Sequence, residues 1–165
     1  NPVLLPRTAL GLAPTLIVGS LLLLLGWKHL SGGIPHKPLT EPGNPLRLRS
    51  AILLALSFQI VLVLLHSLTQ RFGESGVLAS ATVLGLTDMD ALTFGMNRLA
   101  KAPELVPIAA LAITLGVTVN GVVKAAVSGI FGASGYRKLA LPGLLLLAAA
   151  GGAGFWLLKV LMPSR

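Results

Sequence analysis

Five long stretches of the chain are almost free of charged residues, and they constrain the fold more than any other feature. They cover residues 8–27, 50–70, 75–100, 105–131 and 139–159. A bilayer core about 30 Å thick takes roughly 20 apolar residues of α-helix at about 1.5 Å each. Each stretch is long enough to cross a membrane, so the sequence predicts an all-α, polytopic transmembrane bundle of about five spans.

The composition supports a membrane protein and excludes several other classes. Of the 165 residues, 54% are hydrophobic and only 11% are charged, whereas ordinary soluble domains have about 25% charged residues. The net charge of +8 does not indicate a nucleic-acid partner, because the bases lie between apolar runs rather than on one solvated face. The absence of cysteine excludes disulfides, thiolate metal sites and cysteine nucleophiles. The chain does not start with methionine, so we expect a single transmembrane domain, residues 1–165, cut from a longer protein.

The basic residues predict an orientation. The connection 28–49 contains four prolines and should be a surface loop. Five crossings would place eight bases on the side of this loop and four on the other, with the two chain termini on opposite sides. Cytoplasmic loops carry the excess of Lys and Arg, so the loop and the C-terminus are predicted to be cytoplasmic. The eight bases are Lys28, Lys37, Arg47, Arg49, Arg98, Lys101, Lys159 and Arg165, and the four are Arg7, Arg71, Arg137 and Lys138.

Two carboxylates, Asp88 and Asp90, fall near the middle of the third stretch. Each charge at that depth costs about 2.5–3.5 kcal/mol on insertion scales, so both need partners. Thr87 followed by Asp90 has the form of a capping box, and Gly85 adds flexibility, which together predict a helix break near Thr87. Such a break exposes backbone groups at mid-membrane, as in transporters. The alternative is one continuous helix with the two aspartates about 200° apart on different faces.

The fourth stretch has the complementary pattern. Asn120 and Lys124 belong to a four-residue repeat of small and polar residues, and a second stripe of small residues lies beside it. One interpretation is structural: Asn120 and Lys124 neutralise the aspartates and fix the fold. The other is functional: they line a pathway for an ion, a proton or a small polar solute, because charges inside membranes usually serve function. The first stripe is Ala112, Gly116, Asn120, Lys124, Ser128 and Gly132; the second is Gly121, Ala125 and Gly129.

Together these residues predict a mid-membrane site for a cation such as magnesium or sodium, or for a small polar solute. Two carboxylates against one ammonium leave a negative excess, and hard cations prefer carboxylate, amide and hydroxyl oxygens. Lys124 argues against a cation, since its charge would compete. No cofactor and no enzymatic activity are expected, because no substrate-positioning motif accompanies the aspartate pair. The alternative function is a regulatory or assembly module without transport. The candidate residues are Thr87, Asp88, Asp90, Thr93, Asn97, Asn120 and Lys124, with Asp88 and Asp90 as metal ligands.

Several local strings resemble a known family. They are NPLRLRSA at 44–51, GLTDMDA at 85–91, RLA at 98–100 and VNGVVKA at 119–125. These strings resemble the C-terminal domain of unknown function in long MgtC/SapB-family bacterial membrane proteins. The resemblance covers roughly residues 44–138 well, and its Asp-x-Asp and Asn-x3-Lys strings are specific only in combination. It implies a multi-pass protein of the bacterial inner membrane, and the family name associates it with magnesium.

The resemblance also implies partners. A related span with small hydroxyl residues in place of the Asp-x-Asp string lies upstream in that family, and this chain lacks it. The chain would then hold half of a composite site. The other half would come from a second copy in a homo-oligomer or from the missing N-terminal part of the same protein, within the lipid bilayer and without nucleic acid.

Overall fold

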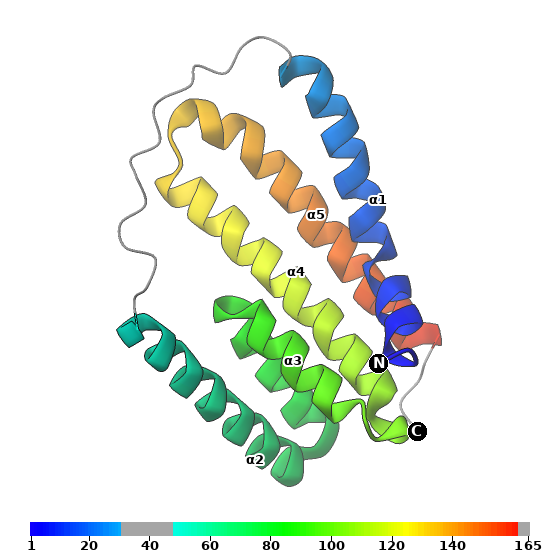
Figure 1. Cartoon of the computed structure of the whole chain (residues 1–165). Helices are drawn as coiled ribbons and strands as arrows, with labels where there is room; N and C mark the ends of the chain where they lie inside the picture. The colour runs from blue at the N-terminus through cyan, green and yellow to red at the C-terminus, as the bar shows by residue number, and fades with distance from the viewer. Residues whose placement is uncertain (31–47, 162–165) are drawn as a thin grey trace.

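The protein is an all-α bundle, as predicted. The computed structural model describes residues 1–30 and 48–161, except for the side chains of residues 27–30 and of many residues in 48–69. Most of the predicted loop 28–49 lies outside the described residues. The elements are α1 Leu4–Leu30, α2 Leu48–Thr87, α3 Met89–Leu99, the short 3-10 helix η1 Pro103–Leu105, α4 Val106–Phe131 and α5 Ser134–Leu161 (Figure 1).

Three helices form the membrane-crossing frame. Within the described chain, the segments long and apolar enough to cross a membrane are Leu4–Gly26, Pro103–Phe131 and Ser134–Leu161. Glycines bring neighbouring helices close: Gly11 of α1 lies against Leu158 of α5, and Gly121 of α4 lies against Ala148 of α5. These contacts make α5 antiparallel to both α1 and α4. The start of α1 and the end of α5 therefore lie at one end of the bundle, called here the terminal end, and the α4–α5 turn marks the opposite turn end (Figure 1).

The second and third predicted stretches are joined through Gly73. Its backbone, with φ 54° and ψ −131°, is not helical, and it divides α2 into two helical halves. A positive φ is a conformation that glycine adopts without the steric cost met by other residues. The chain turns there, at the terminal end, and the second half of α2 rises beside α4 (Figure 1).

The third stretch is discontinuous, as predicted. Helical geometry ends at Thr87 and resumes at Met89, and Asp88 between them is extended, with φ −143° and ψ 99°. The chain reverses at this point. Gly85 and Leu92, on either side of Asp88, both meet Gly116 of α4, and the carbonyl of Ala100 accepts a hydrogen bond from the Asn1 side chain at the terminal end. The second half of α2 and α3 thus form a re-entrant hairpin (Figure 1).

The hairpin tip lies beside the middle of α4. Gly116 and Asn120, which contact Gly85, are close to the middle of the 26-residue helix α4. The hairpin enters and leaves at the terminal end, so the third stretch does not run from one end of the bundle to the other (Figure 1). The start of α1 and the end of α5 lie at the same end, whereas five crossings would separate the two termini. The number of crossings and the sides of the termini in a membrane stay predictions.

The reversal also changes the distribution of bases. Apart from Lys124, the bases whose side chains the structure describes divide into five at the terminal end and two at the turn end. Arg98 and Lys101 thus lie at the same end as Arg7 and Arg71, whereas five crossings would separate them. The predicted orientation in a membrane stays a prediction. The five are Arg7, Arg71, Arg98, Lys101 and Lys159; the two are Arg137 and Lys138.

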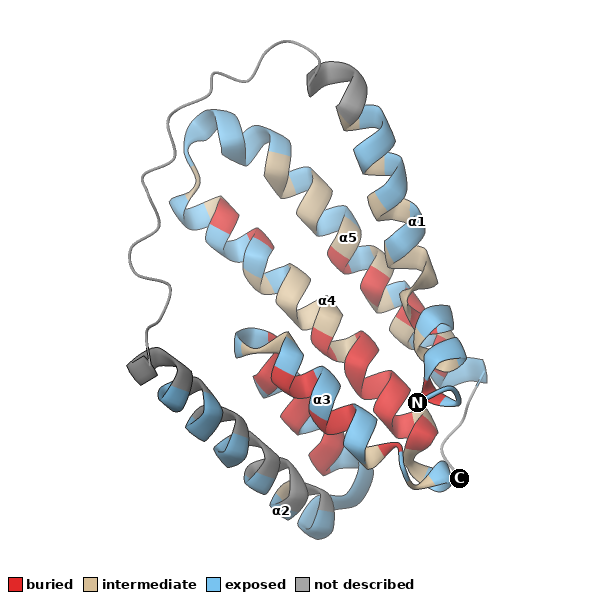
Figure 2. Cartoon of the chain, in the orientation of Figure 1, coloured by how far each residue is buried: buried red, intermediate tan, exposed pale blue. Residues whose placement is uncertain are grey.

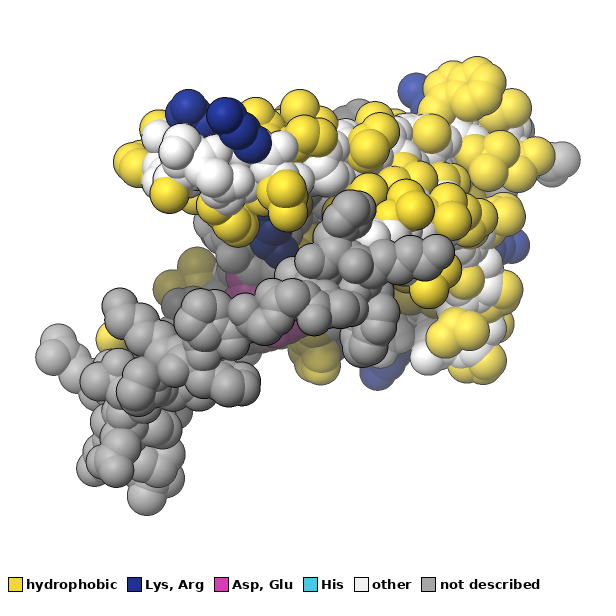
Figure 3. Space-filling view, turned by 90° about the horizontal axis from the view of Figure 1, so that it is seen from above, with side chains coloured by type: hydrophobic (Ala, Val, Ile, Leu, Met, Phe, Trp, Pro, Cys, Tyr) yellow, Lys and Arg dark blue, Asp and Glu magenta, His cyan; other side chains and the backbone are white. Residues whose placement is uncertain are grey.

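The core occupies the lower part of α4, next to the hairpin. Nearly all residues from Val106 to Gly116 are buried, and they pack on Val77, Leu92 and Met96 of the hairpin. Towards the turn end α4 is less buried, with half-buried and exposed residues and only Ala125 and Ser128 buried (Figure 2). Many large apolar side chains are exposed on α1, α2, α4 and α5, and Figure 3 shows some of them from above.

The contact between Gly85 and Gly116 should not tolerate a side chain. A Cβ on Gly85 would lie 2.7 Å from the Gly116 carbonyl oxygen and 2.9 Å from its Cα. Because overpacking costs about 1–3 kcal/mol, Gly85→Ala should lower the thermal stability of the purified protein. The matched control is Gly152→Ala, since a Cβ there meets nothing within 4 Å. Equal melting temperatures for the two variants would contradict this packing.

Candidate functional site

Asp88 caps the helix that starts at the hairpin tip. Its carboxylate oxygen Oδ1 accepts hydrogen bonds from the amides of Asp90, at 2.9 Å, and Ala91, at 3.0 Å. The predicted capping residue, Thr87, is wrong. Thr87 still belongs to α2, and its hydroxyl donates to the carbonyls of Val83 and Leu84. The extended backbone of Asp88, rather than the type of side chain, decides which residue caps α3.

Asn120 of α4 supports the other half of the tip. Its Nδ2 donates to the Gly85 carbonyl at 3.0 Å. Gly85 is among the last four residues of α2, whose carbonyls have no ordinary helical partner. The glycine pair Gly85 and Gly116 brings the two backbones close enough for this bond. Asn120 therefore satisfies a backbone group that the break exposes beside the middle of α4.

Asp90 and Lys124 are exposed and unpaired. Both side chains are described, and within the described chain no ion pair links Lys124 to either aspartate. Lys124 lies one helical turn beyond Asn120, towards the turn end, whereas Asp90 lies on the terminal side of the tip. The predicted neutralisation of an aspartate by Lys124 does not occur within one chain. Asn120 fulfils its predicted structural role through a backbone carbonyl instead.

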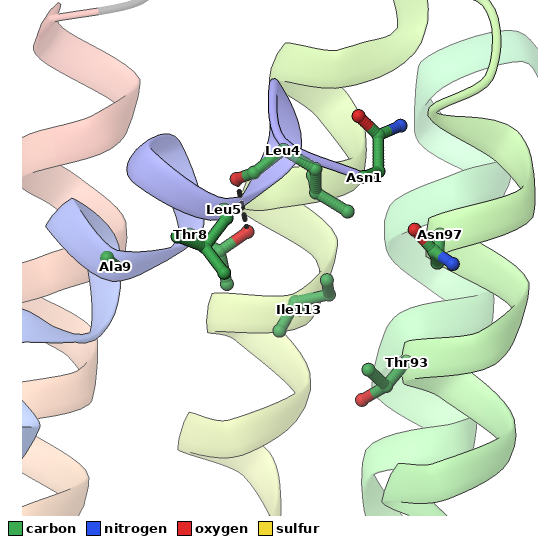
Figure 4. Close-up of a pocket in the computed structure, with 8 residues that line it drawn as sticks. All are labelled: Asn1, Leu4, Leu5, Thr8, Ala9, Thr93, Asn97 and Ile113. Atoms are coloured by element: carbon green, nitrogen blue, oxygen red, sulfur yellow. Dashed lines mark hydrogen bonds between the residues drawn. The ribbon is translucent and has the colours of Figure 1, made fainter.

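Thr93 and Asn97 lie lower on α3, away from the tip. With Asp90 they occupy one exposed face of α3, at spacings of three and four residues; we call these three residues the polar track. Thr93 and Asn97 line an open pocket of 340 Å³ between α3, α4 and the start of α1 (Figure 4). The remaining lining residues are Asn1, Leu4, Leu5, Thr8, Ala9 and Ile113.

The seven candidate residues thus form two groups that the polar track connects. One group surrounds the tip: Thr87, Asp88, Asp90, Asn120 and Lys124. The other, Thr93 and Asn97, lies in the pocket. Thr8 of α1 lines the same pocket and was not predicted. Its hydroxyl donates to the Leu4 carbonyl of its own helix, at 3.0 Å, so nothing local in the sequence marks it as a site residue. Only the tertiary contact of α1 with α3 brings it there.

One carboxylate at the tip is left without a hydrogen-bond partner among the described residues. Among the described residues, no group of three His, Cys, Asp or Glu side chains could hold a metal. Asp88 already accepts two amide hydrogen bonds, which leaves Asp90 as the free carboxylate. Both acids stand in the first turn of α3, where the helix dipole favours negative charge. A metal site at Asp88 and Asp90 stays a prediction.

The two small-residue stripes of α4 serve packing within the chain. Gly116 meets Leu92, Gly121 meets Ala148 of α5, and Gly129 meets Leu141 of α5. These positions let helices approach closely, as small residues do in membranes.

The fold and the tip define a class: a polytopic α-helical membrane protein with a re-entrant hairpin. Residues 1–132 match the family described as "Domain of unknown function (DUF4010)", and the chain belongs to this family. An uncharacterized protein from Aquifex aeolicus (strain VF5) is 33% identical over 90 residues, covering 54% of this chain and 39% of the relative. The matched part thus spans well under half the relative's length. No solved structure matches.

These comparisons confirm the unknown-function domain in the resemblance. Its connection to MgtC/SapB proteins stays a prediction.

The cap at Asp88 gives a stability prediction. Asp88→Ala should lower the free energy of unfolding by about 0.5–2 kcal/mol, because the amides of Asp90 and Ala91 lose their acceptor. Asp88→Asn should retain most of the stability, since its side-chain oxygen can accept the same bonds. Asp90→Asn is the control, because that side chain caps nothing. Thermal unfolding in detergent measures all three; an Asp88→Asn variant as unstable as Asp88→Ala would show that charge, not capping, matters at the tip.

Proposed function

We propose that the protein is a transport or channel-like module that moves a cation or small polar solute past the hairpin tip. The observation that carries the proposal is the re-entrant hairpin, with its break at Asp88 near the middle of α4. Half-helices that end at mid-membrane present backbone dipoles to a solute where lipid offers none, and transporters build their sites in this way.

The polar track supports a route to the tip. Thr93 and Asn97 lead from the pocket at the terminal end to Asp90 along one face of α3. Their side chains offer hydroxyl, amide and carboxylate oxygens, the ligand types that hard cations prefer. The Asn97 side chain has no hydrogen-bond partner among the described residues, so its amide is free to contact a solute. A solute would pass Asn97 and Thr93, reach Asp90, and then meet Lys124.

The proposed solute is a small cation. Asp90 supplies a free negative charge, and Thr87 and Asn120 stand beside the tip with oxygen groups. Magnesium and sodium are the first candidates: magnesium keeps several waters and needs only one or two carboxylates, and one free carboxylate meets that need. The positive charge of the exposed Lys124 would then raise the energy barrier that the cation meets beyond the tip, and its repulsion would favour release of the cation from Asp90. The proposed location is the inner membrane of a bacterium, as the resemblance implies.

A second candidate function is a regulatory or assembly module without transport. One observation favours it: Asp88 and Asn120 already bond to backbone groups of the tip. On this account the polar residues hold the hairpin together, and no solute moves. The two functions differ in what Asp90 should do, because Asp90 takes no part in those bonds.

Flux through liposomes separates the two candidates. Purified protein should carry sodium or magnesium, and Asp90→Asn should reduce the flux at least about tenfold, which corresponds to about 1.4 kcal/mol in the barrier. Glu104→Gln is the matched control, because it makes the same chemical change in an exposed side chain of η1 outside the tip. This control should transport like the native protein.

The binding step has its own readout. A cation present at 100 times its dissociation constant adds about 2.7 kcal/mol to the folded state, so it should raise the melting temperature. Asp90→Asn should abolish that rise while leaving the unliganded melting temperature unchanged. Native protein that shows neither flux nor a thermal response to a panel of mono- and divalent cations would contradict transport and support the module.

A further inference from the structure

Two backbone carbonyls at the hairpin tip have no hydrogen-bond partner. Of the last four carbonyls of α2, that of Leu84 accepts from the amide of the first residue beyond the helix, at 2.7 Å. That of Gly85 accepts from the Asn120 side chain, at 3.0 Å. Within the described part of the chain, no group donates to the carbonyls of Leu86 and Thr87. The break therefore leaves two acceptors bare at the C-terminal end of a helix.

The donors that would serve these carbonyls are bound elsewhere. In a continuous helix, the amides of Asp90 and Ala91 would donate to the carbonyls four residues earlier, which are those of Leu86 and Thr87. Here both amides donate to Oδ1 of Asp88, at 2.9 and 3.0 Å. The bonds that cap the start of α3 are thus the reason that the end of α2 is unsatisfied.

Lipid cannot satisfy the two carbonyls. The tip lies beside α4, which is among the helices long and apolar enough to cross a membrane. Hydrocarbon offers no donor to a bare backbone group, so such groups are costly there. Leu86 and Thr87 are both exposed, so a ligand can reach them. The C-terminal end of a helix also carries partial negative charge, which favours a cation as that ligand.

The Asp90 carboxylate adds a full negative charge at the same turn of the chain. Asp90 is the second residue of α3, and side chains lean towards the N-terminus of their helix, which here is the tip. Among the described residues, nothing donates to this carboxylate or forms an ion pair with it. It follows the bare carbonyls by three and four residues, across the reversal at Asp88. One short turn thus presents three free oxygen ligands.

We infer that the hairpin tip binds a monovalent cation such as sodium, with the carbonyl oxygens of Leu86 and Thr87 and the carboxylate of Asp90 as ligands. Carbonyl oxygens can replace the water around such an ion, and transporters use the C-terminal ends of half-helices to hold sodium. The inference rests on the proposed function, because the bound ion is the one proposed to move past the tip. It narrows that solute to a monovalent cation.

The charges at the tip favour one positive charge over two. Asp88 and Asp90 carry two formal negative charges and Lys124 carries one positive charge, which leaves one negative charge in excess. A monovalent ion makes the tip neutral, whereas magnesium would leave a net positive charge, which is costly inside a membrane. Magnesium also relies on carboxylates and retained waters, so it would make little use of the bare carbonyls.

The Thr87 carbonyl can be observed by itself. Thr87 and Asp88 form the sole Thr-Asp pair in the sequence, so ¹³C at threonine carbonyls and ¹⁵N in aspartate select this carbonyl by NMR in nanodiscs. Sodium or potassium should shift its signal saturably, and magnesium at the same concentration should not. The control is the Met89 carbonyl, selected in the same way through Met-Asp, because it already accepts the Thr93 hydroxyl at 2.8 Å. Its signal should move less.

Variants test the carboxylate. Asp90→Asn should lose the sodium-dependent shift of the Thr87 signal over the same concentration range, whereas Glu104→Gln, in an exposed side chain of η1, should keep it. A Thr87 signal that ignores sodium and potassium, or that responds to magnesium at least as strongly, would overturn the inference. An Asp90→Asn variant that responds like the native protein would also overturn it.

Flux in liposomes separates this inference from the proposed function. A cation that crosses without moving the Thr87 signal would leave transport standing and would overturn the carbonyl site. A saturable shift of the Thr87 signal without flux of sodium or potassium would support the site and contradict transport.

Discussion

The structure depends on how the chain satisfies a helix end inside the bilayer. Lipid cannot hydrogen-bond the amides and carbonyls that a broken helix exposes, so protein groups must do so. Asp88 accepts the first amides of α3, and Asn120 donates to the Gly85 carbonyl of α2. Without these bonds, the reversal at mid-membrane would leave bare backbone groups. The hairpin and the exposed Asp90 both follow from that reversal.

Close glycine contacts make the reversal possible. Gly85 and Gly116 let α2 approach α4 so closely that Asn120 reaches a backbone carbonyl. Gly11, Gly121 and Gly151 similarly bring α1, α4 and α5 together. Association in membranes relies on packing and hydrogen bonds, because lipid tails are as apolar as the helix surfaces. The contacts of the small residues therefore position the helices, and the helices position the polar residues at the tip.

The sequence predicted those features that depend on local pattern. Long apolar stretches predicted the helices, and the Thr87/Asp90 capping pattern with Gly85 predicted the break, because helix length and capping are decided within a few residues. The direction of the chain after the break was not predictable. A broken helix can continue across the membrane or turn back, and the choice depends on packing of Leu92 and Met96 against α4. The sequence analysis took the first of these courses, and the structure shows the second, so Arg98 and Lys101 lie at the end of the bundle that carries Arg71. The reversal of the chain at Asp88 also divides the candidate site into a tip and a pocket. Thr93 and Asn97 lie on α3, which runs from the tip back to the terminal end, so they line the pocket there.

The central claim is that the segment 74–101 enters and leaves the membrane at the same end. Spin labels on Glu74→Cys and Lys101→Cys, both exposed positions, measure this directly by electron–electron double resonance in nanodiscs. Dilution with unlabelled chain isolates the distance within one copy. The hairpin predicts a separation well below the hydrocarbon thickness of about 30 Å, because both labels lie at the terminal end. A separation of about 30 Å or more would show that the segment crosses, and would contradict the hairpin.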